Sequence, residues 1–557
     1  MNNSISRRNW CKHTALVGAE MVVLTPRAYQ RTAERSCRPP QSTEVVGHAE
    51  RFDLTSWQAL AQRAVDAARS AGATYADARL TRNVIMFFKI DEVPTTHLWT
   101  WDMVGVGVRV AVNGYWGFAG APFVEQDAII NMARGAVAQA KVNAKGPPRT
   151  IDLGHIPAVT GTWTMPVQID PFSISMEEKC DFFDLWLDQA AKNKIDIEND
   201  GSCVAVFTRR ECTIATSEGS VFAQTTFASG GRMIATAQSG GIPLPVSGIG
   251  VSGQGWERFV DAKLPDQWPQ LYERSKELGK VGRKPTTVGR YTIICDGSTM
   301  ASIVTNTLGI GTQLDRALGY EADAGGTSFI DDPLSMVGNF PIAPSLVTLT
   351  ANRSLPAGLA TVRWDDEGVE PQPFTLIQNG VLTDFQTTRE QAAWLAPYYQ
   401  QHHRPVRSNG CAFTPDALCI PMQHMPNLSL EPSHTPVRLE DLIGDVRDGI
   451  LIQDGMLSAV DFQARNGLIS GQMRFIRDGK AAEWAEGGSF MINTQQFWKS
   501  LAALGGASTM VERGFDAWSP DGGGLEKGQP PQTASHTVRA VAAMIPNQPL
   551  IIPQNRA

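Results

Sequence analysis

The segment DGSTMASIVTNTLGIGTQLDRALGYEADAGGTSF, residues 296–329, decides how this chain is interpreted. It contains no histidine and no cysteine. Protein zinc sites need imidazole nitrogen, thiolate sulfur or carboxylate oxygen at about 2.0–2.3 Å from the metal. The hydroxyl of Thr305 is a poor zinc ligand at neutral pH, and the side chain of Ile310 has no lone pair. These two positions are therefore unsuited to a metal.

The second half of the segment, residues 312–329, resembles the sequence just downstream of the zinc motif in the TldD/PmbA family of metallopeptidases. That family carries His-Glu-x-x-x-His, followed by a stretch similar to PTELDRVLGYEA. An ungapped comparison places the first histidine at Thr305, the glutamate at Asn306 and the second histidine at Ile310. Matching residues surround these positions: Gly309, Thr312, Leu314, Asp315, Arg316, Gly319, Tyr320 and Glu321.

The third zinc ligand of the family is a cysteine near the C-terminus, in a segment similar to CGKGQPGQ that is followed by Ser-His. The corresponding stretch here is LEKGQPPQ, residues 525–532, followed by Ser535 and His536. Leu525 thus stands at the cysteine position. The glutamate of such motifs acts as a general base, and the amide of Asn306 cannot accept a proton near pH 7. The resemblance implies a chain that lacks three zinc ligands and the base.

The resemblance runs from about residue 55 to residue 540, with its motifs in order. It includes ATSEGSVFAQTTFASGGRMIATA at 215–237, WDDEGVEPQPFTLIQNGVLTDFQTTREQAAWL at 364–395 and RSNGCAFTPDALCIPMQHMPNLSLEPS at 407–433. We therefore expect an α+β fold in two domains. Residues 51–285 would form a domain with antiparallel strands and two long helices, and residues 286–557 a strand-rich domain that carries the zinc site in the family.

Local patterns predict the individual elements of the first domain. An amphipathic helix is expected at 55–72, ended by Gly72, and a second at 176–192, where Ser175 and Glu178 have the spacing of a capping box. Residues 104–112 alternate as a strand, and Asn113-Gly114 predicts a hairpin turn. Four short strands are expected at 204–207, 212–217, 221–228 and 232–237, separated by turns at Glu218-Gly219 and Gly230-Gly231.

Composition excludes some partners and suggests a location. The net charge is −7 and there is no basic run, so a nucleic-acid footprint is not expected. No apolar stretch approaches the length of a membrane span. The sequence SRRNWCK at 6–12 resembles a twin-arginine export motif, so residues 1–50 are predicted to be an export signal and linker, and the protein periplasmic or exported. The alternative is a cytoplasmic protein with a disordered basic tail.

Other clusters of potential ligands have weaker patterns. Cys411 and Cys419 would form a small disulfide loop or remain two free buried thiols. Together with His402, His403 and His424 they make the only His/Cys concentration, interpreted as a surface loop rather than a metal site because the spacing is irregular. The acidic run Asp365-Asp366-Glu367 is expected to be a solvated turn.

Asp315, Arg316, Glu321 and His536 lie in the matched segments and are candidates for shaping the former cleft. The alternative for the three charges is a buried Arg–carboxylate pair, and Arg109 has the same two interpretations. The alternative for His536 is a hydrogen-bonded interior residue.

The resemblance also implies a function. Members of the family, also described as modulators of DNA gyrase, work as pairs in which a TldD-like subunit holds zinc and a TldE-like subunit does not, and the pair admits unfolded polypeptide. This chain would be a non-catalytic subunit with no cofactor of its own and with zinc only in a TldD-like partner, or it would pair with itself. The alternatives are an active peptidase or hydrolase with a non-standard metal site, and a binding or assembly protein derived from the fold.

Overall fold

The computed structural model describes most of the chain after residue 53. The described residues are 19–23, 54–90, 96–122, 126–147, 150–192, 201–239, 242–248, 250–263, isolated residues between 267 and 276, 283–516, 524–528 and 531–551. The predicted export motif and linker lie outside the described residues, apart from 19–23.

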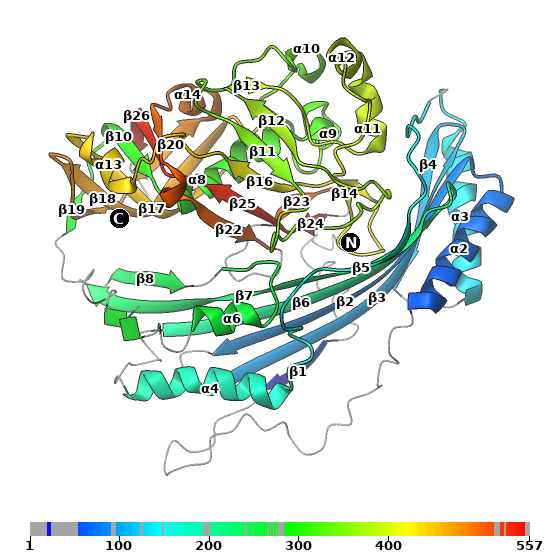
Figure 1. Ribbon diagram of the computed structural model, residues 1–557, viewed down its shortest axis with the longest axis horizontal. Coiled ribbons are helices and arrows are strands. Elements are labelled where there is room, and N and C mark those ends of the chain that lie inside the picture. Colours follow the sequence, from blue (N-terminus) through cyan, green and yellow to red (C-terminus); the bar gives the residue numbers. More distant parts are fainter. Residues whose placement is uncertain are drawn as a thin grey trace, which may run out of the picture.

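The N-terminal half builds one eight-stranded sheet in the order β1-β3-β2-β6-β7-β5, with β4 beside β3 and β8 beside β7. Every pairing is antiparallel except that of β5 with β7. The strands are β1 Ala19–Val23, β2 Tyr75–Ile90, β3 Thr96–Val112, β4 Tyr115–Ala121, β5 Thr160–Thr164, β6 Gly201–Thr216, β7 Val221–Ser239 and β8 Ile242–Gly248. The long strands curve beneath the C-terminal half (Figure 1).

Helices cover this sheet at one end and on the face opposite the C-terminal half (Figure 1). They are α2 Leu54–Ser70, α3 Gln126–Asn143, α4 Met176–Lys192 and α6 Glu257–Ala262. The predicted helices α2 and α4 are present, and the capping box of α4 forms, because the Ser175 hydroxyl accepts from the Glu178 N–H at 3.1 Å and the Glu178 carboxylate accepts from the Ser175 N–H at 3.0 Å. Helix α3 was not predicted.

The four segments predicted as strands between 204 and 237 are in strands, but they join into two long ones, β6 and β7, so the prediction of four short strands is wrong. The turn at Gly219 is present, with φ +97°. The expected turn at Gly230-Gly231 lies instead inside β7. These glycines permit close contact: a Cβ on Gly231 would lie 2.1 Å from the carbonyl oxygen of Val204, and one on Gly230 would lie 2.4 Å from the Cα of Val251.

The C-terminal half contains two further sheets and two short hairpins. The eight-stranded sheet contains β9 Arg283–Pro285, β10 Gly289–Cys295, β17 Asp448–Ser458, β18 Asn466–Arg477, β19 Lys480–Glu486, β20 Ser489–Asn493, β21 Ala503–Leu504 and β26 Ala543–Ile551. The six-stranded sheet contains β11 Leu349–Asn352, β12 Phe374–Gln378, β13 Val381–Leu382, β16 Asn427–Leu430, β22 Val511–Phe515 and β25 His536–Ala540. The hairpins are β14 Ala412–Phe413 with β15 Met422–Gln423, and β23 Leu525–Lys527 with β24 Gln532–Ala534.

Short helices complete the C-terminal half. They are α8 Gly297–Val304, the π-helical turn η1 Thr305–Gly309, α9 Leu314–Ala317, α10 Pro333–Met336, α11 Arg389–Trp394, α12 Ala396–Gln401, α13 Leu439–Gly444, α14 Thr494–Lys499 and the 3₁₀ turn η2 Ala507–Thr509. Helix α8 is buried in the largest apolar core of the described residues, to which Met300, Ile303 and Val304 contribute.

The fold class is α+β, as predicted. The domain boundaries at residues 50 and 285 remain predictions. Strand β9, which begins at Arg283, already pairs with β19 of the C-terminal half. None of the helices in the described residues is long and apolar enough to cross a membrane.

Candidate functional site

The helix that begins at Gly297 changes its hydrogen bonding at Thr305. The carboxylate of Asp296 caps the start by accepting from the Thr299 N–H at 2.8 Å. At the π-helical turn, the N–H of Ile310 donates to the carbonyl oxygen of Thr305. Residues five apart therefore lie on one face here, whereas in an α-helix they would be rotated by about 140° from each other. The backbone thus aligns the two positions at which the His-Glu-x-x-x-His motif would carry histidines.

The side chains at the four degenerate positions, 305, 306, 310 and 525, make protein contacts. The hydroxyl of Thr305 lies 3.4 Å from Nε2 of His536, and the amide of Asn306 donates to the carbonyl oxygen of Ser302 at 3.0 Å. Ile310 is part of the apolar core around α8, and Leu525 packs against the same core. Thr305 thus contacts the C-terminal segment through His536, while Ile310 and Leu525 pack in or against the same apolar core.

The residues at this place do not fit a zinc ion. They supply a hydroxyl, an amide and two alkyl side chains, whereas zinc needs three or four imidazole, thiolate or carboxylate ligands. The imidazole of His536 is fully buried and stacks on the Phe515 ring, and burial lowers its pKa to about 4. Across the part of the chain that the structure describes, no group of three or more His, Cys, Asp and Glu side chains converges as a metal site would require.

The charged candidates join the two matched segments. The buried ammonium of Lys527 donates to the carboxylate of Asp315 at 2.7 Å and to the side-chain oxygen of Gln423 at 2.7 Å. Burial lowers the pKa of Lys527, and Asp315 opposes that shift. The carboxylate of Glu321 accepts from the Gly528 N–H at 2.9 Å. Strand β23, which contains Leu525 and Lys527, is thereby tied to the segment after the π-helical turn.

Arg316 does not make the predicted pair with a carboxylate. Its Nε donates to the side-chain oxygen of Gln313 at 3.1 Å, and its Nη1 donates to the carbonyl oxygen of Gly325. The cation beside Asp315 is instead Lys527. The sequence comparison missed Lys527, although it lies within the matched stretch 525–532.

The acidic turn Asp365-Asp366-Glu367 is fully buried, so the expectation of a solvated turn is wrong. It faces arginines on the long sheet. Arg109 contacts Asp77 at 2.8 Å and Glu367 at 3.1 Å. Arg210 lies 3.4 Å from Asp366. Burial, together with the charge of Glu367, raises the pKa of Asp365 to about 7.

These pairs form an ion cluster between the two halves of the molecule. Arg79 contacts Asp77 at 2.8 Å and donates to the backbone carbonyl of Asp366 at 3.1 Å. Arg389, which pairs with Glu218, donates its backbone N–H to Glu367 at 2.8 Å. For Arg109, the structure thus shows the buried ion pair, one of its two predicted interpretations. A buried cluster of this kind fixes how two elements meet, since neither charge tolerates losing its partner.

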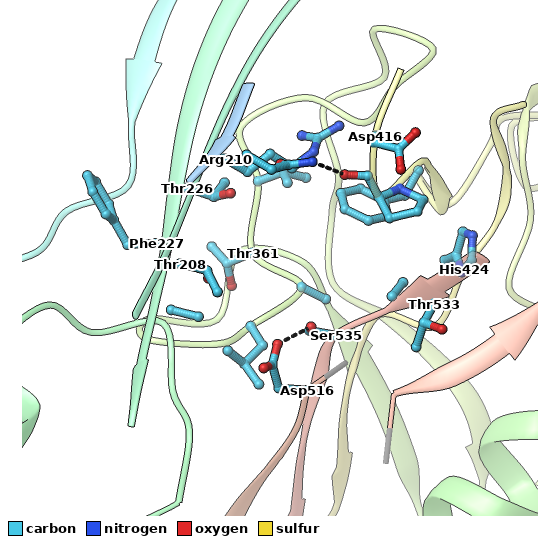
Figure 2. Close-up of a pocket in the computed structure, with 18 of the residues that line it drawn as sticks. Thr208, Arg210, Thr226, Phe227, Thr361, Asp416, His424, Asp516, Thr533 and Ser535 are labelled. Carbon is cyan, nitrogen blue, oxygen red and sulfur yellow. Dashed lines mark hydrogen bonds between the residues drawn. The ribbon is translucent and has the colours of Figure 1, made fainter. Parts of the chain in front are cut away.

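A cavity of about 130 Å³ lies where the two halves meet. Its floor lies on three neighbouring strands and includes Asn83, Ile85, Thr208, Arg209, Arg210, Thr226, Phe227 and Ala228. Its opposite wall comes from the C-terminal half and includes Phe413, Asp416, His424, Asp516, Thr533 and Ser535 (Figure 2). Ala534, which also lines it, pairs with Leu525. The cavity therefore adjoins the degenerate positions.

Within the described residues, the cysteines and the remaining histidines do not form a second site. Cys411 and Cys419 are free thiols in the structure, without the disulfide that was one alternative. Burial raises the pKa of each to about 12. His424 is buried against Gln532, with 3.3 Å between Nε2 and Oε1, and burial followed by the charge of Lys527 lowers its pKa to about 3.

Comparison with known proteins assigns this architecture. The model of the PmbA/TldA metallopeptidase C-terminal domain matches residues 288–528, and the model of the PmbA/TldA metallopeptidase domain 1 matches residues 88–140. The chain belongs to the TldD/PmbA family. A metalloprotease of Methanocaldococcus jannaschii is 24% identical to this family member over 361 residues, which cover 64% of this chain and 73% of that protein.

Solved structures of similar fold cover nearly the whole TldD/PmbA chain. One from Thermotoga maritima MSB8, named as a modulator of a DNA gyrase, has 13% identity and a TM-score of 0.65, and covers 89% of this chain and 100% of that one. TldE from Thermococcus kodakarensis has 14% identity and a TM-score of 0.62, with 88% and 99% covered. At these identities the likeness shows the fold alone.

Proposed function

We propose that this TldD/PmbA protein is a non-catalytic, zinc-less subunit of a peptidase complex, which forms a substrate chamber together with a zinc-bearing, TldD-like partner. The observation that carries the proposal is the set of side chains at 305, 306, 310 and 525. Threonine, asparagine, isoleucine and leucine stand there, and each is held by the protein itself. Without imidazole, thiolate or carboxylate at these positions the zinc chemistry of the family has no ligand set.

The retained framework supports a role in assembly rather than loss of the whole site. The π-helical turn aligns positions 305 and 310, and Lys527 ties the C-terminal strand to Asp315. A protein that no longer used the region around the metal position would not need these contacts for its function. We propose that the surroundings are kept because they shape the chamber in which an unfolded polypeptide is held next to the partner's zinc.

Substrate would be held by its backbone. Unfolded polypeptide can add a strand to an exposed sheet edge, which binds main-chain groups without selecting side chains. We propose that the protein pairs with a TldD-like subunit, or with itself if no such subunit is present. Export by the twin-arginine pathway is a further prediction, to be tested by locating the protein and sequencing its mature N-terminus.

Coexpression with a family member that has the intact His-Glu-x-x-x-His motif tests the proposal. We expect a stable complex in size-exclusion chromatography with light scattering, one zinc per heterodimer by mass spectrometry, and chelator-sensitive cleavage of an unfolded protein such as casein. The chain alone should contain no stoichiometric zinc and cleave nothing. Stoichiometric zinc and chelator-sensitive cleavage in the isolated chain would sink the proposal and favour an active enzyme with a non-standard site.

A further inference from the structure

The outer edge of β3 is open over part of its length. On its inner side, β3 pairs with β2 along residues 96–111, and no register shift interrupts the ladder. On its outer side, β4 pairs with residues 106–112 and β1 with residues 97–101. Within the part of the chain that the structure describes, residues 102–105 have no strand partner on the outer side. This edge therefore offers backbone N–H and C=O groups to a further strand.

The open edge lacks the features by which proteins usually block strand addition. Protected edges are very short, or they carry proline, lysine, a bulge or an inward-pointing charge. Residues 97–105 read HLWTWDMVG, with no proline and no lysine. The carboxylate of Asp102 is already paired with Arg82 of β2 at 2.7 Å. Asp102 and Met103 are both exposed, so a partner can reach this part of the strand.

Side chains on both faces hold β3 in place. Leu98 packs against an apolar core that includes Phe183 of α4. The ring centroids of Trp99 and Phe87 lie 5.4 Å apart, on the other face. A preformed edge leaves only the incoming chain to be ordered, and binding then loses less conformational entropy than when both partners must be ordered.

The structure contains a strand that already uses this edge. β1 pairs antiparallel with β3, so that Ala19 lies opposite Trp101 and Val23 opposite His97 (Figure 1). β1 has five residues, and β3 is its sole partner among the described strands. A short strand with one partner opens at a lower free energy than strands paired on both sides. β1 also belongs to residues 1–50, which are predicted to be the export signal and linker.

The edge leads to the space between the two halves. Trp101 packs against an apolar cluster that Leu359 of the C-terminal half joins. Alternate residues of a strand point to the same face, so Trp99, Trp101 and Met103 share this face. Met103 lines the cavity between the halves. A strand added to residues 97–105 would therefore pass the rim of that cavity.

We infer that the outer edge of β3, residues 97–105, binds an extended segment of an unfolded polypeptide as an added antiparallel strand, and that β1 competes for part of this edge. The inference rests on the proposed function and deepens it, because it names the edge at which the chamber would hold its substrate. Main-chain pairing selects no sequence, whereas Trp99, Trp101 and Met103 favour apolar side chains at every second position of the bound segment. At about 3.3 Å per residue, the bound segment is roughly 30 Å long.

Fluorescence anisotropy with the full-length chain and a labelled peptide, Lys-Thr-Val-Thr-Val-Thr-Val-Thr-Lys, tests the inference. An analogue with every threonine and valine nitrogen methylated keeps the side chains but cannot donate from those main-chain nitrogens. We expect saturable binding of the plain peptide. The methylated analogue should bind at least about tenfold more weakly, because several main-chain hydrogen bonds are lost together.

The double variant E20C/T100C tests the competition by β1. Glu20 and Thr100 are directly opposed in the β1–β3 register, so oxidation would lock β1 on the edge. The reduced variant should bind the plain peptide as the wild type does, and the oxidised variant at least about tenfold more weakly. T100C alone is the control, and oxidant should not change its affinity for the peptide.

M103K and M491K form a matched pair. Met103 and Met491 are 38% and 48% exposed, but β20, which carries Met491, pairs with a strand on each side. M103K should weaken peptide binding by about 3-fold or more, because a charge replaces an apolar neighbour of the added strand. M491K should leave the affinity unchanged. A photo-cross-linking form of the peptide should attach within or next to residues 97–105.

Equal binding of the plain and methylated peptides, no saturable binding, equal effects of M103K and M491K, or no disulfide in oxidised E20C/T100C would overturn the inference. Self-association that oxidation abolishes, without peptide binding, would assign the edge to a second copy instead. The wild-type peptide series decides even if a variant misfolds. These measurements need neither zinc nor a partner, so failure to form a complex with a zinc-bearing subunit would refute the proposed function and leave the binding result intact.

Discussion

At the scale of single residues, the positions matched to the zinc ligands combine side chains that cannot bind zinc with a backbone that brings two of them to one face. The N–H of Ile310 reaches the carbonyl oxygen of Thr305 across a π-helical turn, so the two side chains leave the same face. π-helical turns are rare and cluster at functional sites. In this chain the turn stands where neither Thr305 nor Ile310 can bind a metal.

This geometry predicts that ligands can be restored. The quadruple substitution T305H/N306E/I310H/L525C should bind about one zinc per chain by mass spectrometry, because it supplies three suitable ligands and the general base at the positions where the family motif carries them. The single variant L525C, which changes only one position, should bind none. A folded quadruple variant without zinc would show that the backbone no longer provides the site.

A second prediction at this scale concerns His424. Its pKa in the folded protein is about 3, below the ordinary value of about 6.5, because burial disfavours the imidazolium form. As pH falls, the His424 imidazole is protonated in the unfolded chain before it is protonated in the folded protein. The contribution of neutral, buried His424 to stability is therefore complete above pH 6.5 and is lost as pH falls from there towards 3. The free energy of unfolding should drop by about 1.4 kcal/mol per pH unit from this residue alone.

Urea unfolding of the wild type and of H424Q at pH 7.5, 5.5 and 4.5 measures this slope. H424Q should have a shallower dependence below pH 6.5. H434Q is the control, because His434 is exposed, and it should keep the wild-type slope. Identical slopes for the wild type and H424Q would contradict the assignment.

At the scale of elements, glycines decide where strands meet other segments. β3 carries Gly107 opposite the loop that follows β14, and a Cβ there would lie 2.0 Å from the carbonyl oxygen of Ala417. The strand predicted for 104–112 is present as the second half of β3. Its Gly107 is explained by this close contact with the C-terminal half. The glycines at 230 and 231 have a similar cause inside β7, and this is why an expected turn became a strand.

Replacing Gly107 by alanine should destabilise the protein by about 1–3 kcal/mol, the usual range for overpacking, with the loss seen as a lower denaturation midpoint. Gly135 gives the matched control. It lies in α3 with no atom within 4 Å of an added Cβ, so G135A should be neutral or stabilising by up to about 1 kcal/mol. A neutral G107A would mean that the loop moves away at little cost.

At the scale of the whole molecule, the buried ion cluster holds the C-terminal half on the long sheet. Asp366 is fully buried and accepts from the Thr414 N–H at 2.9 Å and from its hydroxyl at 2.9 Å, next to Arg210. Removing one partner of a buried ion pair leaves the other charge uncompensated. Arg210, the partner of Asp366, also lines the cavity between the two halves.

Asp366→Ala should therefore cost about 3–5 kcal/mol of unfolding free energy by urea denaturation. The matched control is Asp478→Ala. Asp478 pairs with Arg447 at 3.8 Å, and the side chains of Arg447 and Asp478 are 93% and 89% exposed. Exposed ion pairs of this kind contribute at most about 1 kcal/mol. Similar losses for the two variants would show that burial of the cluster is not what stabilises the interface.

The sequence by itself determined the family, the α+β class, the hairpin at Asn113-Gly114 and the presence at 305, 306, 310 and 525 of residues that cannot form a zinc ligand set, because these depend on local patterns and on residue chemistry. Only the tertiary structure decided that Asp365-Asp366-Glu367 is buried and that Lys527 is the partner of Asp315. It also placed the polar residues Thr208 and Arg210 in the floor of a cavity. Burial and charge pairing come from contacts between segments hundreds of residues apart, as for Arg109 and Glu367, and no local pattern records them.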